Sequence, residues 1–391
     1  MDFDVDAHTI FLGLSGSHAY GTARPGSDLD LRGCCVAPLD LRLSFRRHFE
    51  QVTWPSEVPL GPRCRAALVR AAEHPSAGPS LAEQPEVPDL VIYDLAKLVG
   101  LCARQNPNTL ELLFVDPREI LFTTPTWERL RAERRSFLSQ KVRHTFSGYA
   151  RGQLDRIRRH RQWLLSPPNH APTRAEFGLP EQSVISADER NQIEEAITKV
   201  LRAWSVDEGI DLPAAERDVL RERMREFWTT CMQAPGLELV AESPDLDLAL
   251  ADRAGASLGL GSAVLKTLRQ ERRYRSSRQH WEQFLRWQRE RNPARAALEA
   301  KHGYDTKHGM HLIRLLRMGV EILASGDLRV RRDDAEELLA IRAGALDYDA
   351  LLEQADALEQ AMRDALPSTP LPVEVDEPAL DRLLVELIVS A

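Results

Sequence analysis

The chain has 391 residues, of which 43% are hydrophobic and 28% are charged. This length favours two domains, and the absence of any run of eighteen apolar residues argues against a transmembrane helix. The start of the chain is acidic and lacks the basic region of a signal peptide, and five cysteines without a C-x-x-C pair argue against a disulfide framework or a zinc ribbon. We therefore expect a cytoplasmic globular protein.

The formal net charge of −8 is unevenly distributed. Eleven Arg and Lys stand against two acids in residues 129–161, and fourteen stand against five in residues 266–317. In residues 333–391 the balance inverts, with fifteen Asp and Glu against three Arg. Because a polyanion responds to the local field of a surface, these basic faces keep a nucleic-acid partner open. The alternative is that they are solvated helix faces paired with the acidic C-terminal stretch.

Hydrophobic patterns predict three strands in the first part of the chain, at residues 8–15, 28–36 and 90–93. Between about 44 and 88 the periodicity fades and Pro, Arg and Gly accumulate, which predicts a long, partly mobile insertion. Helices are expected at 94–104 and from Asn106 to Leu113.

Beyond Pro125 the apolar spacing is almost wholly helical, with breaks at 164–173, 235–244 and 366–378. Helices are predicted at 126–164, 186–204, 213–233, 260–291, 305–324 and 334–364. The expected fold class is α+β: a small mixed-sheet domain in residues 1–125, followed by a mostly helical domain in residues 126–391.

The stretch from Gly16 to Asp30 carries the chemistry. The first strand leads into a Gly16-Ser17 turn at the start of a short helix, where backbone N–H groups and a hydroxyl can hold a phosphate oxygen. On the next strand Asp28 and Asp30 alternate with Leu29 and so emerge on one face. Two neighbouring carboxylates suit Mg²⁺ or Mn²⁺, and a phosphate cradle beside such a pair is what nucleotidyl transfer requires. The alternative is a plain turn with an Asp cap.

This Gly-Ser, ten-residue, Asp-x-Asp arrangement resembles the signature of the polymerase-β-like nucleotidyltransferase superfamily. Downstream segments resemble its YcgL/RlaP branch, which is linked to RNA repair; they lie at 89–98, 105–114, 149–154 and 303–317. The resemblance implies a palm-like sheet domain in which Gly16 and Ser17 hold the triphosphate and Asp28 and Asp30 bind the metals. The superfamily uses a third carboxylate on a later strand, for which Asp89 is the best candidate. Asp94 is the second choice, since it more plausibly caps the following helix.

A second candidate cluster lies in the predicted helix at 305–324, where Lys307, His311 and Arg314 share one face and His308 lies one position round. These groups are expected to bind the nucleotide phosphates; the alternatives are contact with an RNA backbone or a structural polar seam. A metal site at His308 and His311 would require further ligands, which this pattern does not supply. Asn106, Asn108 and Glu111 either form part of an active-site wall or mark the start of a helix, with Glu111 in its first turn facing the helix dipole.

Arginines in the basic stretches are expected to bind RNA phosphates, because guanidinium groups bind phosphate in a bidentate way. The residues concerned are Arg143, Arg151, Arg158, Arg159, Arg275 and Arg278. The expected reaction is Mg²⁺-dependent transfer of a nucleoside monophosphate from an NTP to an acceptor hydroxyl, with an RNA 3′ end such as that of tRNA as the preferred acceptor. Two alternatives are AMP transfer to a protein partner such as a toxin, and a non-catalytic nucleotide- or RNA-binding module.

Overall fold

The computed structural model describes residues 3–24, 27–56, 58–74, 89–183, 186–204 and 258–391. The chain divides into two compact units: unit 1 comprises residues 1–166 and 292–391, and unit 2 comprises residues 167–291. The predicted domain boundary at residue 125 falls inside unit 1. The predicted helix at 213–233, the break at 235–244 and residues 75–88 of the insertion lie outside the described residues.

Unit 1 contains a mixed sheet with the strand order β3-β4-β2-β1-β5. The described strands are β1 (Thr9–Leu14), β2 (Asp30–Cys35), β3 (Gln51–Trp54), β4 (Asp89–Asp94) and β5 (Ile120–Thr123). β2 and β4 run parallel, and the other neighbouring pairs run antiparallel. The mixed sheet, followed by a mostly helical chain, confirms the expected α+β fold class.

The segment predicted as a long insertion contains regular structure, which corrects that expectation. β3 pairs with β4 at the edge of the sheet, and a helix follows it, α3 (Pro62–Ala72). β3 is only four residues long, and only Val52 and Trp54 are buried in it. Such a short alternating pattern is hard to detect among Pro and Gly.

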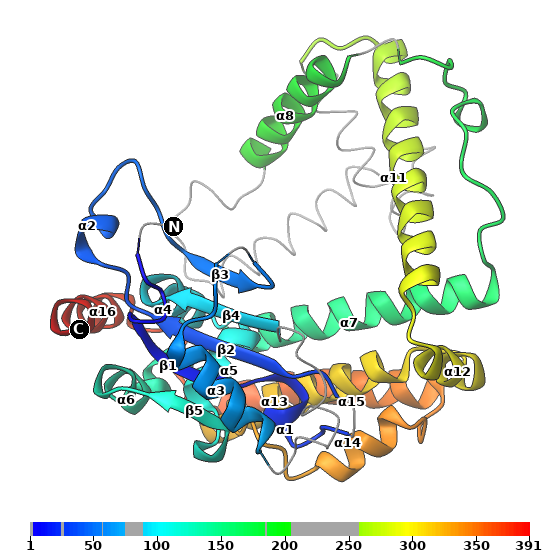
Figure 1. Cartoon of the computed structure of the whole chain (residues 1–391). Helices are drawn as coiled ribbons and strands as arrows, with labels where there is room; N and C mark the ends of the chain where they lie inside the picture. The colour runs from blue at the N-terminus through cyan, green and yellow to red at the C-terminus, as the bar shows by residue number, and fades with distance from the viewer. Residues whose placement is uncertain (1–2, 25–26, 57, 75–88, 184–185, 205–257) are drawn as a thin grey trace. The chain divides into compact units, whose positions relative to one another are not determined.

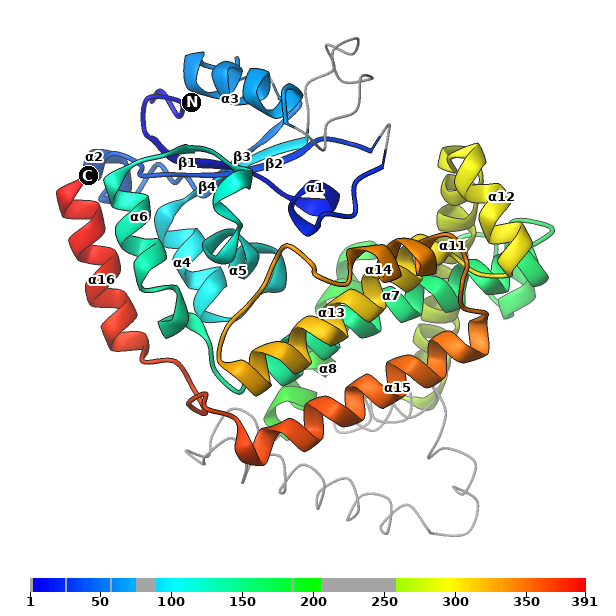
Figure 2. The same cartoon turned by 90° about the horizontal axis from the view of Figure 1, so that it is seen from below.

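Helices cover both faces of the sheet (Figure 2). One face packs on α4 (Leu95–Ala103) and α5 (Pro107–Phe114), and α3 packs on the other. Asp94 caps α4 by accepting a hydrogen bond from the backbone N–H of Ala96 at 3.0 Å, as expected for a helix cap. Leu29 and Leu31 are buried with α3, so the intervening Asp30 faces the α4 and α5 side of the sheet.

The helical part of unit 1 is arranged around α13 (Thr306–Ser325), which is amphipathic and packs on its neighbours through Leu312, Ile313 and Leu316. These side chains belong to one core cluster with the residues under α4 and α5. Its companions are α6 (Pro125–Ala132), α7 (Val142–Leu165), α12 (Pro293–His302), α14 (Ala335–Arg342), α15 (Tyr348–Ala365) and α16 (Glu377–Ser390). α7, α14 and α15 contact α13, and α16 lies against α4 and α6 (Figures 1 and 2).

Two predicted helices are each split in the structure. The helix expected at 126–164 forms α6, a 3₁₀ turn at Arg134–Phe137 and α7. The helix expected at 334–364 forms α14 and α15, because Gly344 adopts a φ of +95° that ends the first of them. Apolar spacing continues across both breaks, and so periodicity alone does not reveal them.

Unit 2 contains α8 (Ala187–Trp204) and α11 (Ser262–Glu290), close to their predicted positions. Buried Glu271 of α11 forms an ion pair with Arg174 and accepts a hydrogen bond from Ser183 at 3.1 Å. In the described part of the chain, no helix combines the length and the apolar character needed to cross a membrane.

Candidate active site

The Gly16-Ser17 turn packs directly against Asp30. β1 ends at Leu14, and α1 (Gly16–Tyr20) begins at once with Gly16 at a φ of +60°. A Cβ atom at position 16 would collide with the Asp30 carboxylate, and the backbone N–H of Ser15 donates to the backbone oxygen of Asp30 at 2.9 Å. Only glycine therefore allows both the left-handed backbone and this close approach.

Three carboxylates meet at the same edge of the sheet. Asp28 is exposed and lies two residues before β2, Asp30 opens β2, and Asp89 opens β4 directly opposite Asp30 in the parallel register. Burial raises the pKa of Asp30, and the nearby charges of Asp89 and Asp28 raise it further. The crowding of like charge favours a bound cation, and oxygen-only ligands fit Mg²⁺ or Mn²⁺.

Arg32 holds the third carboxylate and is not among the residues expected from the sequence. Its guanidinium forms an ion pair with the Asp89 carboxylate at 3.2 Å and donates to the Asp89 backbone oxygen at 2.8 Å. Arg32 also counteracts the rise in the pKa of Asp30. Its position two residues after Asp30 in an alternating strand is the one signal in the sequence that places it on the same face.

Lys307 in the first turn of α13 faces the carboxylates. Burial lowers the pKa of this half-buried amine, as do Arg295 and Arg342, while Asp28 and Asp30 act in the opposite direction. The structure therefore brings Lys307 together with the predicted metal ligands. Burial also lowers the pKa of His311 far below its usual value, helped by Arg314 and Lys307, so His311 is a neutral polar group at pH 7 rather than an added positive charge.

The Arg314 side chain does not have the nucleotide-binding position that the sequence predicts. Its side chain is buried, forms an ion pair with Glu111 at 2.7 Å, and lies over the Tyr20 ring at 3.7 Å. The Tyr20 hydroxyl donates to the other Glu111 oxygen at 2.6 Å. Arg314 and Glu111 thus form a structural contact that ties α13 and α5 to the end of α1, and Asn106 caps α5. Burial raises the pKa of Tyr20, so its hydroxyl remains a donor.

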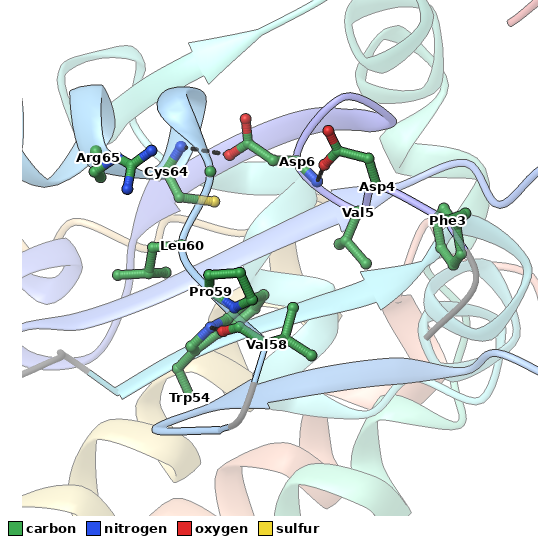
Figure 3. A pocket seen from close by; sticks show the side chains of 11 residues that line it. Phe3, Asp4, Val5, Asp6, Trp54, Val58, Pro59, Leu60, Cys64 and Arg65 are labelled. Carbon is green, nitrogen blue, oxygen red and sulfur yellow. Dashed lines mark hydrogen bonds between the residues drawn. The ribbon is translucent and has the colours of Figure 1, made fainter.

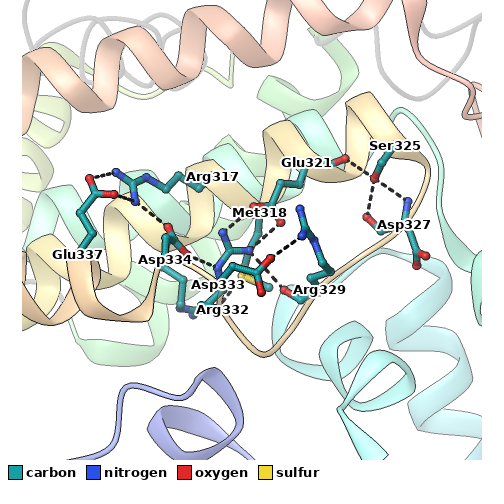
Figure 4. A network of polar contacts seen from close by, with 11 residues as sticks. Arg317, Met318, Glu321, Ser325, Asp327, Arg329, Arg332, Asp333, Asp334 and Glu337 are labelled. Carbon is teal, nitrogen blue, oxygen red and sulfur yellow. Dashed lines mark hydrogen bonds and ion pairs between the residues drawn. The ribbon is translucent and has the colours of Figure 1, made fainter.

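A second polar network supports α1 from the loop between α13 and α14 (Figure 4). Arg332 forms ion pairs with Glu321 at 2.6 Å and Asp334 at 2.9 Å, and Arg317 bonds Asp334 at 2.6 Å. The backbone N–H of Arg332 donates to the backbone oxygen of Tyr20, the last residue of α1, at 3.1 Å. The network therefore holds the loop where it can fix the helix that carries the Gly16-Ser17 turn.

His160, Asp305 and His308 form a polar cluster behind Lys307, and their ligand atoms lie within 4.8 Å of one another. Asp305 caps α13 through the backbone N–H of His308 at 3.2 Å, and the Arg295 guanidinium occupies both of its oxygens. Burial lowers the pKa of His308 to about 4. Because the carboxylate is already paired with Arg295, this cluster acts as a polar clamp between α7, α12 and α13.

The arginines expected to bind RNA divide into two groups. On α7, Arg143, Arg151 and Arg158 lie eight and seven residues apart on one side of the helix, and their side chains make no hydrogen bond or ion pair with another described residue. Arg159 has a partner. On α11, Arg275 is paired with Glu194, and Arg278 is paired with Glu282 at 3.1 Å.

A cavity of about 580 Å³ lies on the other face of the sheet, away from the side to which Asp30 points (Figure 3). Phe3, Val5, Trp54 and Leu60 line it, and Asp6 closes one end by accepting hydrogen bonds from the first turn of α3, including one from the Cys64 N–H at 2.8 Å. Its position separates it from the carboxylate edge.

The Gly16-Ser17 turn therefore packs on Asp30 at the end of a small mixed sheet, as the sequence pattern predicts. Residues 3–164 match the model of the RlaP family, the RNA repair pathway DNA polymerase beta family. The match confirms the resemblance over this part of the chain; the resembling segment at 303–317 and α12 to α16 lie beyond it. No curated protein and no solved structure matches the chain.

Proposed function

We propose that the protein transfers a nucleoside monophosphate from an NTP to the 3′ hydroxyl of an RNA, such as a tRNA or a broken RNA. The observation that carries this proposal is the meeting of Asp28, Asp30 and Asp89 at one sheet edge, beside the Gly16-Ser17 turn. The family match to an RNA repair pathway supports the choice of RNA over a protein acceptor.

In the proposed reaction the acceptor hydroxyl oxygen forms a bond to the α-phosphorus of the NTP. The bond from that phosphorus to the bridging oxygen breaks, and pyrophosphate leaves with the bonding electrons. When held by Asp28, Asp30 and Asp89, Mg²⁺ or Mn²⁺ supplies Lewis-acid chemistry that favours loss of the hydroxyl proton and neutralises phosphate charge. Asp89 would accept that proton and pass it to solvent, and the ion pair with Arg32 would fix its orientation.

The remaining residues bind and orient the substrates. The Ser17 hydroxyl and the N–H groups of the turn contact the triphosphate, and Lys307 balances its charge from the other side. On α7, the unpaired arginines at 143, 151 and 158 bind the RNA backbone. The paired arginines of α11 are weaker candidates, because binding RNA there would require breaking an existing ion pair.

The proposal is tested by offering each of four α-labelled NTPs to the purified protein with Mg²⁺, with and without total tRNA. We expect label in RNA for the unaltered protein and a loss of at least about 10³-fold in Asp28→Asn and Asp30→Asn, because both remove metal ligands. The matched control is Asp40→Asn, since Asp40 is exposed and makes only a surface pair with Arg47 at 3.2 Å.

Each other outcome contradicts the proposal in a different way. Label that enters a co-purified protein while RNA ends stay unmodified would make the chain a protein-modifying enzyme. Nucleotide binding without any transfer, unchanged in Asp28→Asn, would make it a non-catalytic binding module.

A further inference from the structure

Arg342 differs from three nearby arginines of α13 and of the loop that follows it. Arg314, Arg317 and Arg332 each have a carboxylate partner. Arg342, at the end of α14, is half-buried, and its side chain makes no hydrogen bond or ion pair with a described residue. Lys307 is half-buried and unpaired in the same way. Positive groups removed from water without a partner are unfavourable unless an anion joins them.

These two groups belong to one cluster of positive charge. Burial lowers the pKa of Arg342, and its neighbours Arg24 and Arg295 lower it further. Arg295 is already paired with Asp305, and the Arg24 guanidinium donates to the backbone oxygen of Leu339 in α14 at 2.9 Å. Arg342 and Lys307 are therefore the members whose side chains have no polar partner among the described residues, and Arg24 has only a neutral one.

The cluster is fixed in position and lies within electrostatic reach of Asp28. The Thr306 hydroxyl donates to the backbone oxygen of Arg342 at 2.8 Å and so joins the end of α14 to the start of α13. Asp28 lies within electrostatic reach of both Arg342 and Lys307. A ligand between the two sides would meet metal-binding carboxylates on one side and a guanidinium with an ammonium on the other.

We infer that Lys307 of α13 and Arg342 of α14, with Arg24 beside them, form a binding site for the pyrophosphate part of the nucleotide, in which Lys307 and Arg342 lie outside the family-matched segment. A guanidinium fork and a point charge suit two linked phosphates, which offer oxygens in two places. The inference rests on the proposed function for the role of this ligand. Arg342 then neutralises the charge of the leaving pyrophosphate, the role expected of Arg314 from the sequence. Arg314 is instead paired with Glu111.

The test is direct binding of inorganic pyrophosphate to the full chain, measured by calorimetry in EDTA at fixed ionic strength, with orthophosphate alongside. We expect Arg342→Gln to weaken pyrophosphate binding about ten-fold or more, and Arg342→Lys to restore part of it, since the charge returns without the fork. Pyrophosphate should bind the unaltered protein well above orthophosphate. The matched control is Arg363→Gln on α15, whose guanidinium bonds only the nearby Gln360 and Glu359.

Thermal unfolding of each variant establishes that it is folded. Unchanged pyrophosphate binding in folded Arg342→Gln overturns the inference, as does equal binding of pyrophosphate and orthophosphate. A larger loss for a short RNA than for pyrophosphate also overturns it, because Arg342 would then face the acceptor. If pyrophosphate binding depends on Arg342 but no NTP supports transfer, the binding site stands and the proposed function fails. If transfer occurs but Arg342→Gln leaves pyrophosphate binding unchanged, the proposed function stands and the inference about Arg342 fails.

Discussion

Asp30 lies at the centre of the charged groups of the candidate site. Gly16 lets the Gly-Ser turn approach it, Asp89 lies opposite it, and Lys307 and Arg32 partly balance its charge. The net effect, led by burial, raises its pKa above the usual value of 3.8. The folded state therefore binds a proton at Asp30 more tightly than the unfolded chain does, and the ionised carboxylate destabilises the fold above its folded pKa.

We predict that Asp30→Asn makes the metal-free protein more stable at pH 7 while it abolishes transfer. The gain arises because a neutral amide removes the ionised group that burial disfavours. As the pH falls through the pKa of Asp30, the carboxyl of the unaltered protein becomes neutral too, and the difference should vanish. Urea unfolding in EDTA between pH 7 and pH 4 measures this.

Adding Mg²⁺ should make the unaltered protein more stable than Asp30→Asn, which is the opposite of the order in EDTA. At a Mg²⁺ concentration about a hundred times its Kd, the unaltered protein should gain about 2.7 kcal/mol, whereas Asp30→Asn should gain much less. Asp40→Asn should follow the unaltered protein in both buffers. An Asp30→Asn protein that is less stable than the unaltered one in EDTA would contradict the prediction.

Glu111 is predicted to be a stability residue. Glu111→Gln leaves the buried Arg314 guanidinium without a counter-charge, and breaking a buried pair from one side typically costs about 3–5 kcal/mol. Tyr20→Phe removes one hydrogen bond to the same carboxylate and should cost about 1–3 kcal/mol. Urea unfolding at pH 7 compares the two variants. Equal stability of Glu111→Gln and the unaltered protein would show that Arg314 finds another partner.

At this scale, the sequence predicts residues whose chemistry is local and misses those that depend on tertiary contacts. Gly16, Ser17, Asp28 and Asp30 lie within fifteen residues, and Asp89 follows from the start of the third strand. Arg314 and Lys307 look equivalent on one helix face, yet one is paired with Glu111 and the other faces Asp30. Arg342 lies in an acidic stretch, and nothing in the sequence places it near Asp28.

Among the helices, α7 is predicted to carry most of the RNA affinity. Replacing Arg143, Arg151 and Arg158, three of its arginines without a partner among the described residues, with alanine should weaken binding of a single-stranded RNA about ten-fold or more in low salt. Since each phosphate contact contributes about 0.7 to the slope of log K against log salt, the slope should fall in magnitude by about 2.

The control for α7 is Arg278→Ala on α11, where the arginine is already paired with Glu282. It should leave both the affinity and the salt slope close to those of the unaltered protein. Fluorescence anisotropy at several chloride concentrations measures both quantities. If the α11 variant loses as much affinity as the α7 triple variant, the division into paired and unpaired arginines does not decide where RNA binds.

Element prediction succeeds where a pattern is long and fails where tertiary contacts define the element. α11 and α13 fall within two residues of their predicted bounds. β3 and β5 have four residues each and are stabilised by pairing with β4 and β1, which local sequence does not reveal. The asparagine at 106 is a helix cap, as one reading expected. Glu111 lies in the second turn of α5 and is buried against Tyr20, whereas that reading placed it in the first turn facing the helix dipole.

On the scale of the whole molecule, one hydrophobic core extends across residue 125, where the sequence predicts a domain boundary. Phe137 and Phe146 belong to the same buried cluster as Leu98 under the sheet and Ile313 of α13. Apolar periodicity identifies these residues as buried but does not say which of them pack together. The family match ends at residue 164, whereas the core of unit 1 continues through residues 292–391.

We therefore predict that a chain ending at residue 166 does not unfold cooperatively, although it contains the matched segment. Without α13, the faces of α5 and α7 that carry Leu112, Phe146 and Ile157 would be exposed to water. Burying one such side chain contributes about 1.5–3 kcal/mol, so losing several removes an amount comparable to the 5–15 kcal/mol that holds a domain folded. The control removes residues 167–291 and joins 166 to 292 with a long Gly-Ser linker, which keeps all of unit 1. Circular dichroism during heating should show a sharp transition for this control and none for the truncated chain. A sharp transition for the truncated chain would show that residues 1–166 form a domain alone, with the positive cluster around Lys307 and Arg342 as a separate addition.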